Sequence, residues 1–200
     1  MNKVLISIFL LLSTSSAYAV PILYPSGPQV NVSVTDITSG GWTECYAGTM
    51  AAHVTGSQLK TACAGDYVMM GGRQTGASTF LALASAAFDD VFFATTGNNL
   101  HLANGTNWYF RDNYSMGFTE ANDSVSLNSC DISNSPLSMC LHLSPDGGYR
   151  INAITGLNNS SAYEKIFYVA NDSGQVPVPA PLALMGLGLV AMISTRRKKA

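Results

Sequence analysis

The sequence predicts an all-β protein, an antiparallel β-sandwich or barrel, between an N-terminal signal peptide and a C-terminal hydrophobic helix. Three observations lead to this prediction. Short apolar runs recur about every 8 to 12 residues, turn residues separate them, and helix-capping signals are few. The turn residues include Gly97-Asn98-Asn99, Asn104-Gly105 and Pro145-Asp146-Gly147-Gly148, which tolerate a positive φ.

Residues 1–19 have the order of a secretory signal peptide. Lys3 precedes an apolar run at 4–12, and Ala17 and Ala19 are the small residues expected just before a cleavage site. The apolar run, of about ten residues, is shorter than the ~20 residues that a spanning helix needs. We therefore expect cleavage after Ala19 and export of the chain.

Proline-rich segments border one expected domain at residues 29–170. The lead-in at 20–28 and the linker at 171–181 contain prolines, which withhold backbone donors from a sheet. Residues 78–87, rich in alanine and leucine, are interpreted as a buried strand. Alternating or continuous apolar residues predict strands at 30–35, 67–70, 79–84, 90–95, 100–103, 107–111, 124–127, 139–143, 149–154 and 163–169.

The exported body is acidic. Without the signal peptide and the basic C-terminus it keeps five basic and twelve acidic residues, a net charge of −7. Nucleic-acid binding needs a basic patch or stripe. No nucleic-acid partner is therefore expected.

Four cysteines, an even number, lie in the expected exported body: Cys45, Cys63, Cys130 and Cys140. An oxidising compartment favours two disulfides, and four cysteines allow three pairings. Proximity in the sequence favours Cys45 with Cys63 and Cys130 with Cys140, although four free thiols stay an alternative. A zinc site is disfavoured because no Cys-x-x-Cys or His-x-x-x-His spacing accompanies them.

The C-terminal segment 182–200 combines a short apolar run with a basic end. Residues 182–195 would form a helix of about 21 Å, short of the ~30 Å hydrocarbon core of a membrane. Such a segment holds a chain in the inner membrane only transiently. The positive charges should stay cytoplasmic, which leaves the body outside. The basic end is Arg196-Arg197-Lys198-Lys199, and the preceding linker ends in Val176-Pro177-Val178-Pro179-Ala180-Pro181.

This three-part order, prolines, apolar run and basic cluster, resembles the PEP-CTERM sorting signal of Gram-negative bacteria. The resemblance covers about the last 25 residues, and the usual Pro-Glu-Pro is Pro177-Val178-Pro179 here. It implies that an exosortase processes the tail, and that the protein reaches the cell surface or extracellular matrix alongside exopolysaccharide and biofilm systems. An ordinary C-terminal membrane anchor is the alternative.

The sequence offers no motif for catalysis, so the protein is not expected to be an enzyme. His53, His101 and His142 are far apart, and nucleophile-elbow, phosphate-loop and zinc-protease motifs are lacking. A serine, a histidine and a carboxylate brought together from distant positions would reopen the question. No cofactor or metal is predicted, because Asp89-Asp90 and Asn122-Asp123 are interpreted as turn residues rather than calcium ligands.

Aromatic residues crowd one expected hairpin and are the candidate glycan contacts: Trp108, Tyr109 and Tyr114. Exposed rings beside polar side chains can stack on a sugar, whereas the alternative is that both faces of the hairpin are packed. The leading hypothesis is a structural or adhesive role at the cell surface or in an exopolysaccharide matrix. A carbohydrate-binding module and a matrix-acting hydrolase are the alternatives.

Overall fold

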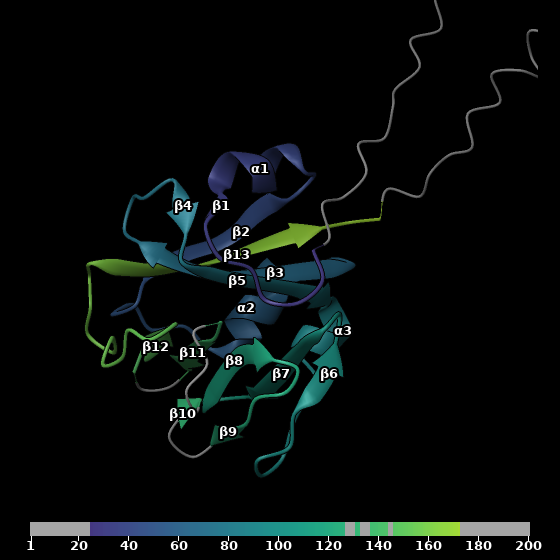
Figure 1. Ribbon diagram of the computed structural model, residues 1–200, viewed down its shortest axis with the longest axis vertical. Coiled ribbons are helices and arrows are strands. Elements are labelled where there is room, and N and C mark those ends of the chain that lie inside the picture. Colours follow the sequence, from purple (N-terminus) through teal and green to yellow (C-terminus); the bar gives the residue numbers. More distant parts are fainter. Residues whose placement is uncertain (1–24, 127–130, 133–136, 144–145, 173–200) are drawn as a thin grey trace, which may run out of the picture. The chain divides into compact units, whose positions relative to one another are not determined.

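Antiparallel strands make up most of the regular secondary structure in the described chain (Figure 1), which confirms the all-β prediction. The computed structural model describes residues 25–126, 131–132, 137–143 and 146–172. Contacts divide the protein into two units, residues 20–172 and residues 1–19 with 173–200, and every described residue lies in the first. The finer assignment to a sandwich or barrel stays a prediction.

One of the two larger sheets has four strands and places the last strand in its interior. The order is β2-β13-β3-β5, and all three pairings are antiparallel. The register between β2 and β13 shifts at Phe167/Tyr168, where β2 has a bulge. The strands are β2 (Thr43–Thr49), β3 (Tyr67–Gln74), β5 (Ala82–Ala87) and β13 (Tyr163–Ala170).

The other larger sheet has five strands in the order β12-β11-β8-β7-β6. Its turn between β6 and β7 contains Asn104 and Gly105, with φ of 46° and 70°. This confirms the predicted Asn-Gly hairpin, because such turns need two residues that accept a positive φ. The strands are β6 (His101–Ala103), β7 (Thr106–Arg111), β8 (Ser115–Glu120), β11 (Met139–His142) and β12 (Arg150–Ile151).

Two short ribbons accompany these sheets. β1 (Val32–Ser33) pairs with β4 (Thr79–Phe80), and β9 (Val125–Ser126) pairs with β10 (Asp131–Ile132). The buried-strand interpretation of residues 78–87 is confirmed, since β4 and β5 together fill most of that segment.

Two predicted strands were wrong in large part, because short helices replace them. The strand expected at 30–35 gives way to α1 (Val34–Ser39), since the side chain of Ser33 accepts a hydrogen bond from Asp36 N and caps the helix. The strand expected at 90–95 overlaps α3 (Phe88–Val91), and Asp89 and Asp90 are helical rather than turn residues. Carboxylates in a first helical turn are favourable beside its free backbone N–H groups.

Helix α2 (Gly56–Ala62) and the edge strand β2 were not predicted from the sequence. Helix α2 begins with a capping box, in which Thr55 Oγ1 accepts from Gln58 N while Gln58 Oε1 accepts from Thr55 N. Strand β2 lacks a clean apolar alternation because it is half exposed and bulged.

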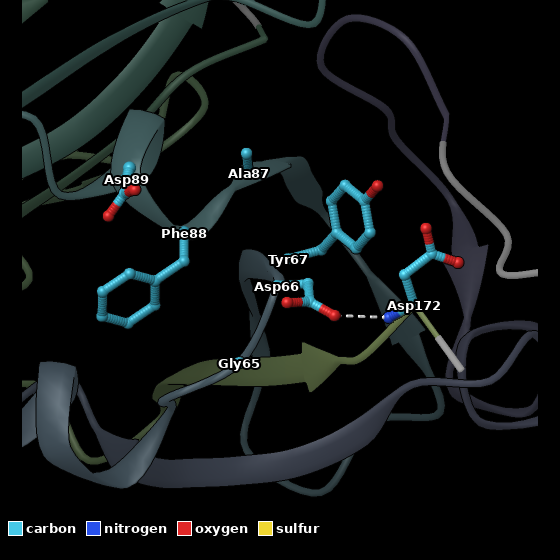
Figure 2. A pocket seen from close by; sticks show the side chains of 7 residues that line it. All are labelled: Gly65, Asp66, Tyr67, Ala87, Phe88, Asp89 and Asp172. Carbon is cyan, nitrogen blue, oxygen red and sulfur yellow. Dashed lines mark hydrogen bonds between the residues drawn. The ribbon is translucent and has the colours of Figure 1, made fainter. Parts of the chain in front are cut away.

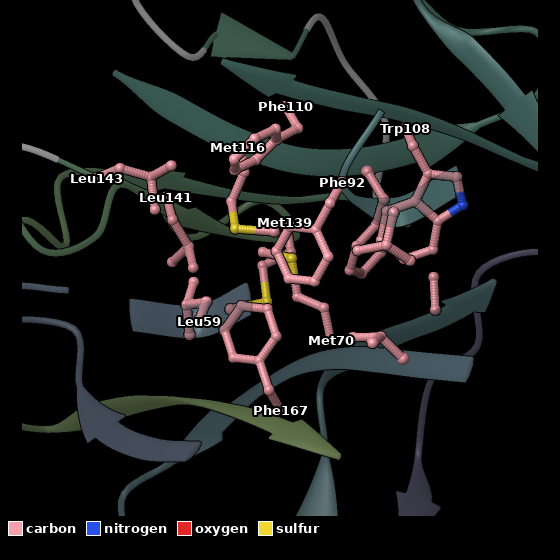
Figure 3. Packing of buried hydrophobic residues seen from close by; sticks show 14 of the residues in the cluster. Leu59, Met70, Phe92, Trp108, Phe110, Met116, Met139, Leu141, Leu143 and Phe167 are labelled. Atoms are coloured by element: carbon pink, nitrogen blue, oxygen red, sulfur yellow. The ribbon is translucent and has the colours of Figure 1, made fainter. Parts of the chain in front are cut away.

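The largest hydrophobic cluster takes residues from both larger sheets (Figure 3). Met70 and Phe167 come from the four-stranded sheet, and Phe110, Met116 and Met139 come from the five-stranded one. A second cluster, on the opposite face of the four-stranded sheet, joins it to α1 through Ile37, Trp42, Phe80 and Tyr168. The four-stranded sheet is therefore buried on both faces, which explains the continuous burial of residues 68–72 in β3.

Candidate functional site

The candidate glycan contacts on β7 are buried. Trp108 is 1% exposed and packs against Phe118, with 5.5 Å between ring centroids. Tyr109 is 0% exposed and lies over Gly117, where an added Cβ would come within 2.5 Å of the tyrosine hydroxyl. The glycan prediction was therefore wrong for these two residues, because both faces of β7 are packed.

Tyr114 has a different environment in the turn between β7 and β8. Its ring is partly exposed, and the guanidinium carbon of Arg111 lies 5.0 Å from the ring centroid. An arginine over an aromatic face contributes a cation–π attraction of about 0.5–1 kcal/mol at an exposed position. Of the three predicted residues, Tyr114 alone presents a surface to solvent.

An acidic pocket of about 400 Å³ lies where several strand ends meet (Figure 2). Asp66 lies just before β3 and Asp172 just after β13, and Asp66 Oδ2 accepts a hydrogen bond from Asp172 N at 2.7 Å (Figure 2). Phe88 and Asp89 of α3 line another part of it. The remaining lining residues are Gly65, Tyr67 and Ala87.

The pocket contains the carboxylates of Asp66, Asp89 and Asp172, but these do not form a metal-binding cluster. In the part of the chain that the structure describes, no three His, Cys, Asp or Glu side chains converge closely enough to hold a metal ion. Carboxylate oxygens accept hydrogen bonds, so the pocket is suited to hydroxyl or amine donors.

Beside this pocket, an exposed aromatic ring that was not predicted from the sequence lies in the segment between α3 and β6. His101 Nε2 donates to Asp90 Oδ1 at 2.7 Å, and the imidazole stacks on Phe93 with ring centroids 4.3 Å apart at 15°. Phe93 is 51% exposed. Asp90, Phe93 and His101 are separated by up to eleven positions in the sequence. Asp89, next to Asp90 in the sequence, lines the pocket.

The other histidines do not form a hydrolytic triad in the described residues. His142 Nδ1 lies 3.2 Å from Asn158 Oδ1 and 3.9 Å from Asp146 Oδ2, and His53 is exposed. No serine is among the hydrogen-bond partners of His101 or His142 in that part of the chain.

Lys165 is a buried cation on β13. Its side chain is 0% exposed, and its Nζ donates to the backbone carbonyls of Ala52 and Gly147. Burial lowers the pKa of Lys165 from 10.5 to about 8, because the charged form loses its hydration. Lys165 thereby joins the loop after β2 to the loop that follows β11.

The predicted disulfide between Cys45 and Cys63 is present. It joins β2 to the residue that ends α2. Cys140 is also disulfide-bonded, whereas Cys130 lies outside the described residues.

The predicted signal and sorting residues lie outside the described residues: Ala17, Ala19, Pro177, Val178, Pro179, Arg196, Arg197, Lys198 and Lys199. Among the helices that the structure describes, none is long and apolar enough to cross a membrane.

Comparison with known proteins identifies the tail. Residues 175–198 match the family model of the PEP-CTERM protein-sorting motif, in agreement with the resemblance seen in the sequence. No match to the chain was found among curated proteins or among solved structures. Its C-terminal tail is thus a PEP-CTERM sorting motif, which makes the chain an exosortase-targeted protein exported to the cell surface.

Proposed function

We propose that the protein is a structural or adhesive component of the cell surface or extracellular matrix of a Gram-negative bacterium, in an exopolysaccharide or biofilm. The observation that carries this proposal is the sorting motif at residues 175–198. A sorting tail of this kind directs export of the attached body. After the tail is removed, the body is the part that acts outside the cell.

The sequence order of the tail supports a two-step route. The apolar segment 182–195 is short for a stable membrane span, and the basic residues Arg196 to Lys199 should hold it at the inner membrane with the body outside. Exosortase processing then separates the body from this transient tether.

Two features of the body suit such a location. The Cys45–Cys63 disulfide needs an oxidising compartment to form and persist. The net charge of −7 keeps exported copies mutually repulsive and soluble until they meet a partner.

A gene deletion, with complementation, tests the proposed role. Under shear, the deletion strain should retain less matrix biomass than the wild type, and the wild-type gene should restore the retained biomass. A gene in which Arg196 to Lys199 are replaced by glutamine should fail to restore it, whereas Lys60→Gln, a charge change in the body, should restore it. Unchanged biomass in the deletion strain would contradict the proposal.

A carbohydrate-binding module is the second candidate, and a specific observation favours it. Phe93 presents an exposed ring beside carboxylates, in place of the buried Trp108 and Tyr109.

A further inference from the structure

The ring of Phe93 is exposed to solvent, whereas the neighbouring Phe92 is buried. Phe88 and Phe92 pack together with ring centroids 4.9 Å apart, and Phe92 is joined to the main core. Burying a phenylalanine is worth about 1.5–3 kcal/mol relative to leaving it exposed. Folding therefore gains little from the exposed part of the ring at position 93.

The exposed ring is held in a fixed orientation. One of its faces is covered by the imidazole of His101 in a nearly parallel stack, and that imidazole is anchored to Asp90 of α3. A ring positioned in advance loses less conformational freedom on binding, which improves affinity. Phe93, His101 and Asp90 are called the Phe93 platform below.

The platform includes a hydrogen-bonding group that is open to solvent. The Asp90 carboxylate is 39% exposed, and in the described part of the chain its Oδ2 atom has no partner. Thr96 and Asn99, in the loop between Phe93 and β6, are exposed polar residues. A flat apolar face bordered by such groups matches a hexose ring, which presents C–H bonds on one face and hydroxyls around its edge.

The charge of this surface selects among polysaccharides. Asp89 and Asp90 are adjacent in α3, the neighbouring pocket adds Asp66 and Asp172, and the body carries a net charge of −7. Like charges brought together are unfavourable, so this surface repels an anionic polysaccharide. An uncharged polysaccharide is not repelled.

We propose that the Phe93 platform binds hexose units of an uncharged polysaccharide, with one sugar stacked on Phe93 and its hydroxyls donating to Asp90. The inference rests on the proposed function, because it names the matrix component that the exported body would contact. It assigns the stacking role that the sequence analysis gave to Trp108 to a different element of the fold.

The test measures binding of the purified secreted protein to three uncharged polymers, laminarin, dextran and galactomannan, and to anionic alginate, by affinity electrophoresis. At least one uncharged polymer should retard the wild type, and alginate should not. Phe93→Ala should weaken that binding by about tenfold or more, because the stacked ring supplies most of the apolar contact. Asp90→Asn should weaken it less.

Leu102→Ala is the matched control. Leu102 is 62% exposed and follows His101 in β6, where successive side chains point to opposite faces. This change should leave binding within about twofold of the wild type. Phe93→Trp keeps a stacking ring and should bind at least as well, which separates loss of the ring from loss of the fold.

Failure to bind any uncharged polymer would overturn the inference, as would equal losses from Phe93→Ala and Leu102→Ala. These results leave the proposed function standing if the protein is still found in the matrix. Conversely, a protein that binds an uncharged polysaccharide in vitro but remains in the cytosol would contradict the proposed function alone.

Discussion

Replacing Lys165 with methionine tests whether the ammonium group of Lys165 is buried between the loops that contain Ala52 and Gly147. The wild-type side chain is fully buried, and its ammonium donates to the carbonyls of Ala52 and Gly147. Methionine has a similar length and cannot be charged, so the substitution removes the titration while largely preserving the packing.

The magnitude follows from the pKa of Lys165, which burial lowers from 10.5 to about 8. Because the pKa is lower in the folded state, the unfolded chain binds more protons between pH 8 and pH 10.5. The stability of the wild type therefore rises with pH across this window. The difference between the two pKa values of Lys165 corresponds to about 3 kcal/mol of folding stability, since each pH unit contributes about 1.4 kcal/mol.

The assay is urea unfolding of the secreted protein at pH 7, 8, 9 and 10. The free energy of unfolding of the wild type, relative to Lys165→Met, should rise by about 2–3 kcal/mol from pH 7 to pH 10. Burial raises the pKa values of Tyr46 and Tyr168, but both variants share this effect and it cancels in the difference. Lys60→Met controls for the loss of one positive charge elsewhere. A difference that stays constant with pH would refute the burial argument.

Three further substitutions have expected effects on stability, measured by thermal and urea unfolding. Cys45→Ser should lower the free energy of unfolding by about 3 kcal/mol, because the disulfide closes a loop of 18 residues. No change in stability after reduction of the wild type would contradict this. Gly117→Ala should destabilise the protein by about 1–3 kcal/mol, since its Cβ would meet the carbonyl of Met139 and the ring of Tyr109. A neutral effect would show that β8 can move to make room for the added methyl group. Thr55→Ala removes the capping box of α2 and should cost about 1 kcal/mol, whereas Thr61→Ala in the same helix should cost less.

The sequence predicted those parts of the fold that depend on local pattern. The Asn104-Gly105 turn was recognisable because the two residues that accept a positive φ stand between two apolar runs. The Cys45–Cys63 pair was favoured by proximity alone.

The short helices were missed because four to seven residues are too few to display helical periodicity. Their signals lay in the caps instead: Thr55 and Gln58, three positions apart, form a capping box that the sequence already contained. A search for such pairs would have found α2, although not the uncapped α3.

The candidate site was predicted less well because burial is a property of the tertiary structure. The consecutive aromatic residues Trp108, Tyr109 and Phe110 place large rings on both faces of β7, but they do not show what covers each face. The Phe93 platform depends on a contact across the loop between α3 and β6, and the place of Lys165 depends on Ala52, more than a hundred positions away. Neither arrangement has a signature in the sequence.

The intact mass of the protein recovered from the surface and matrix fractions tests the central claim most directly. The account predicts a chain that begins at Val20 and has lost the basic residues Arg196 to Lys199 through cleavage near the Pro177-Val178-Pro179 motif. A surface-exposed protein whose mass includes the complete tail would contradict it.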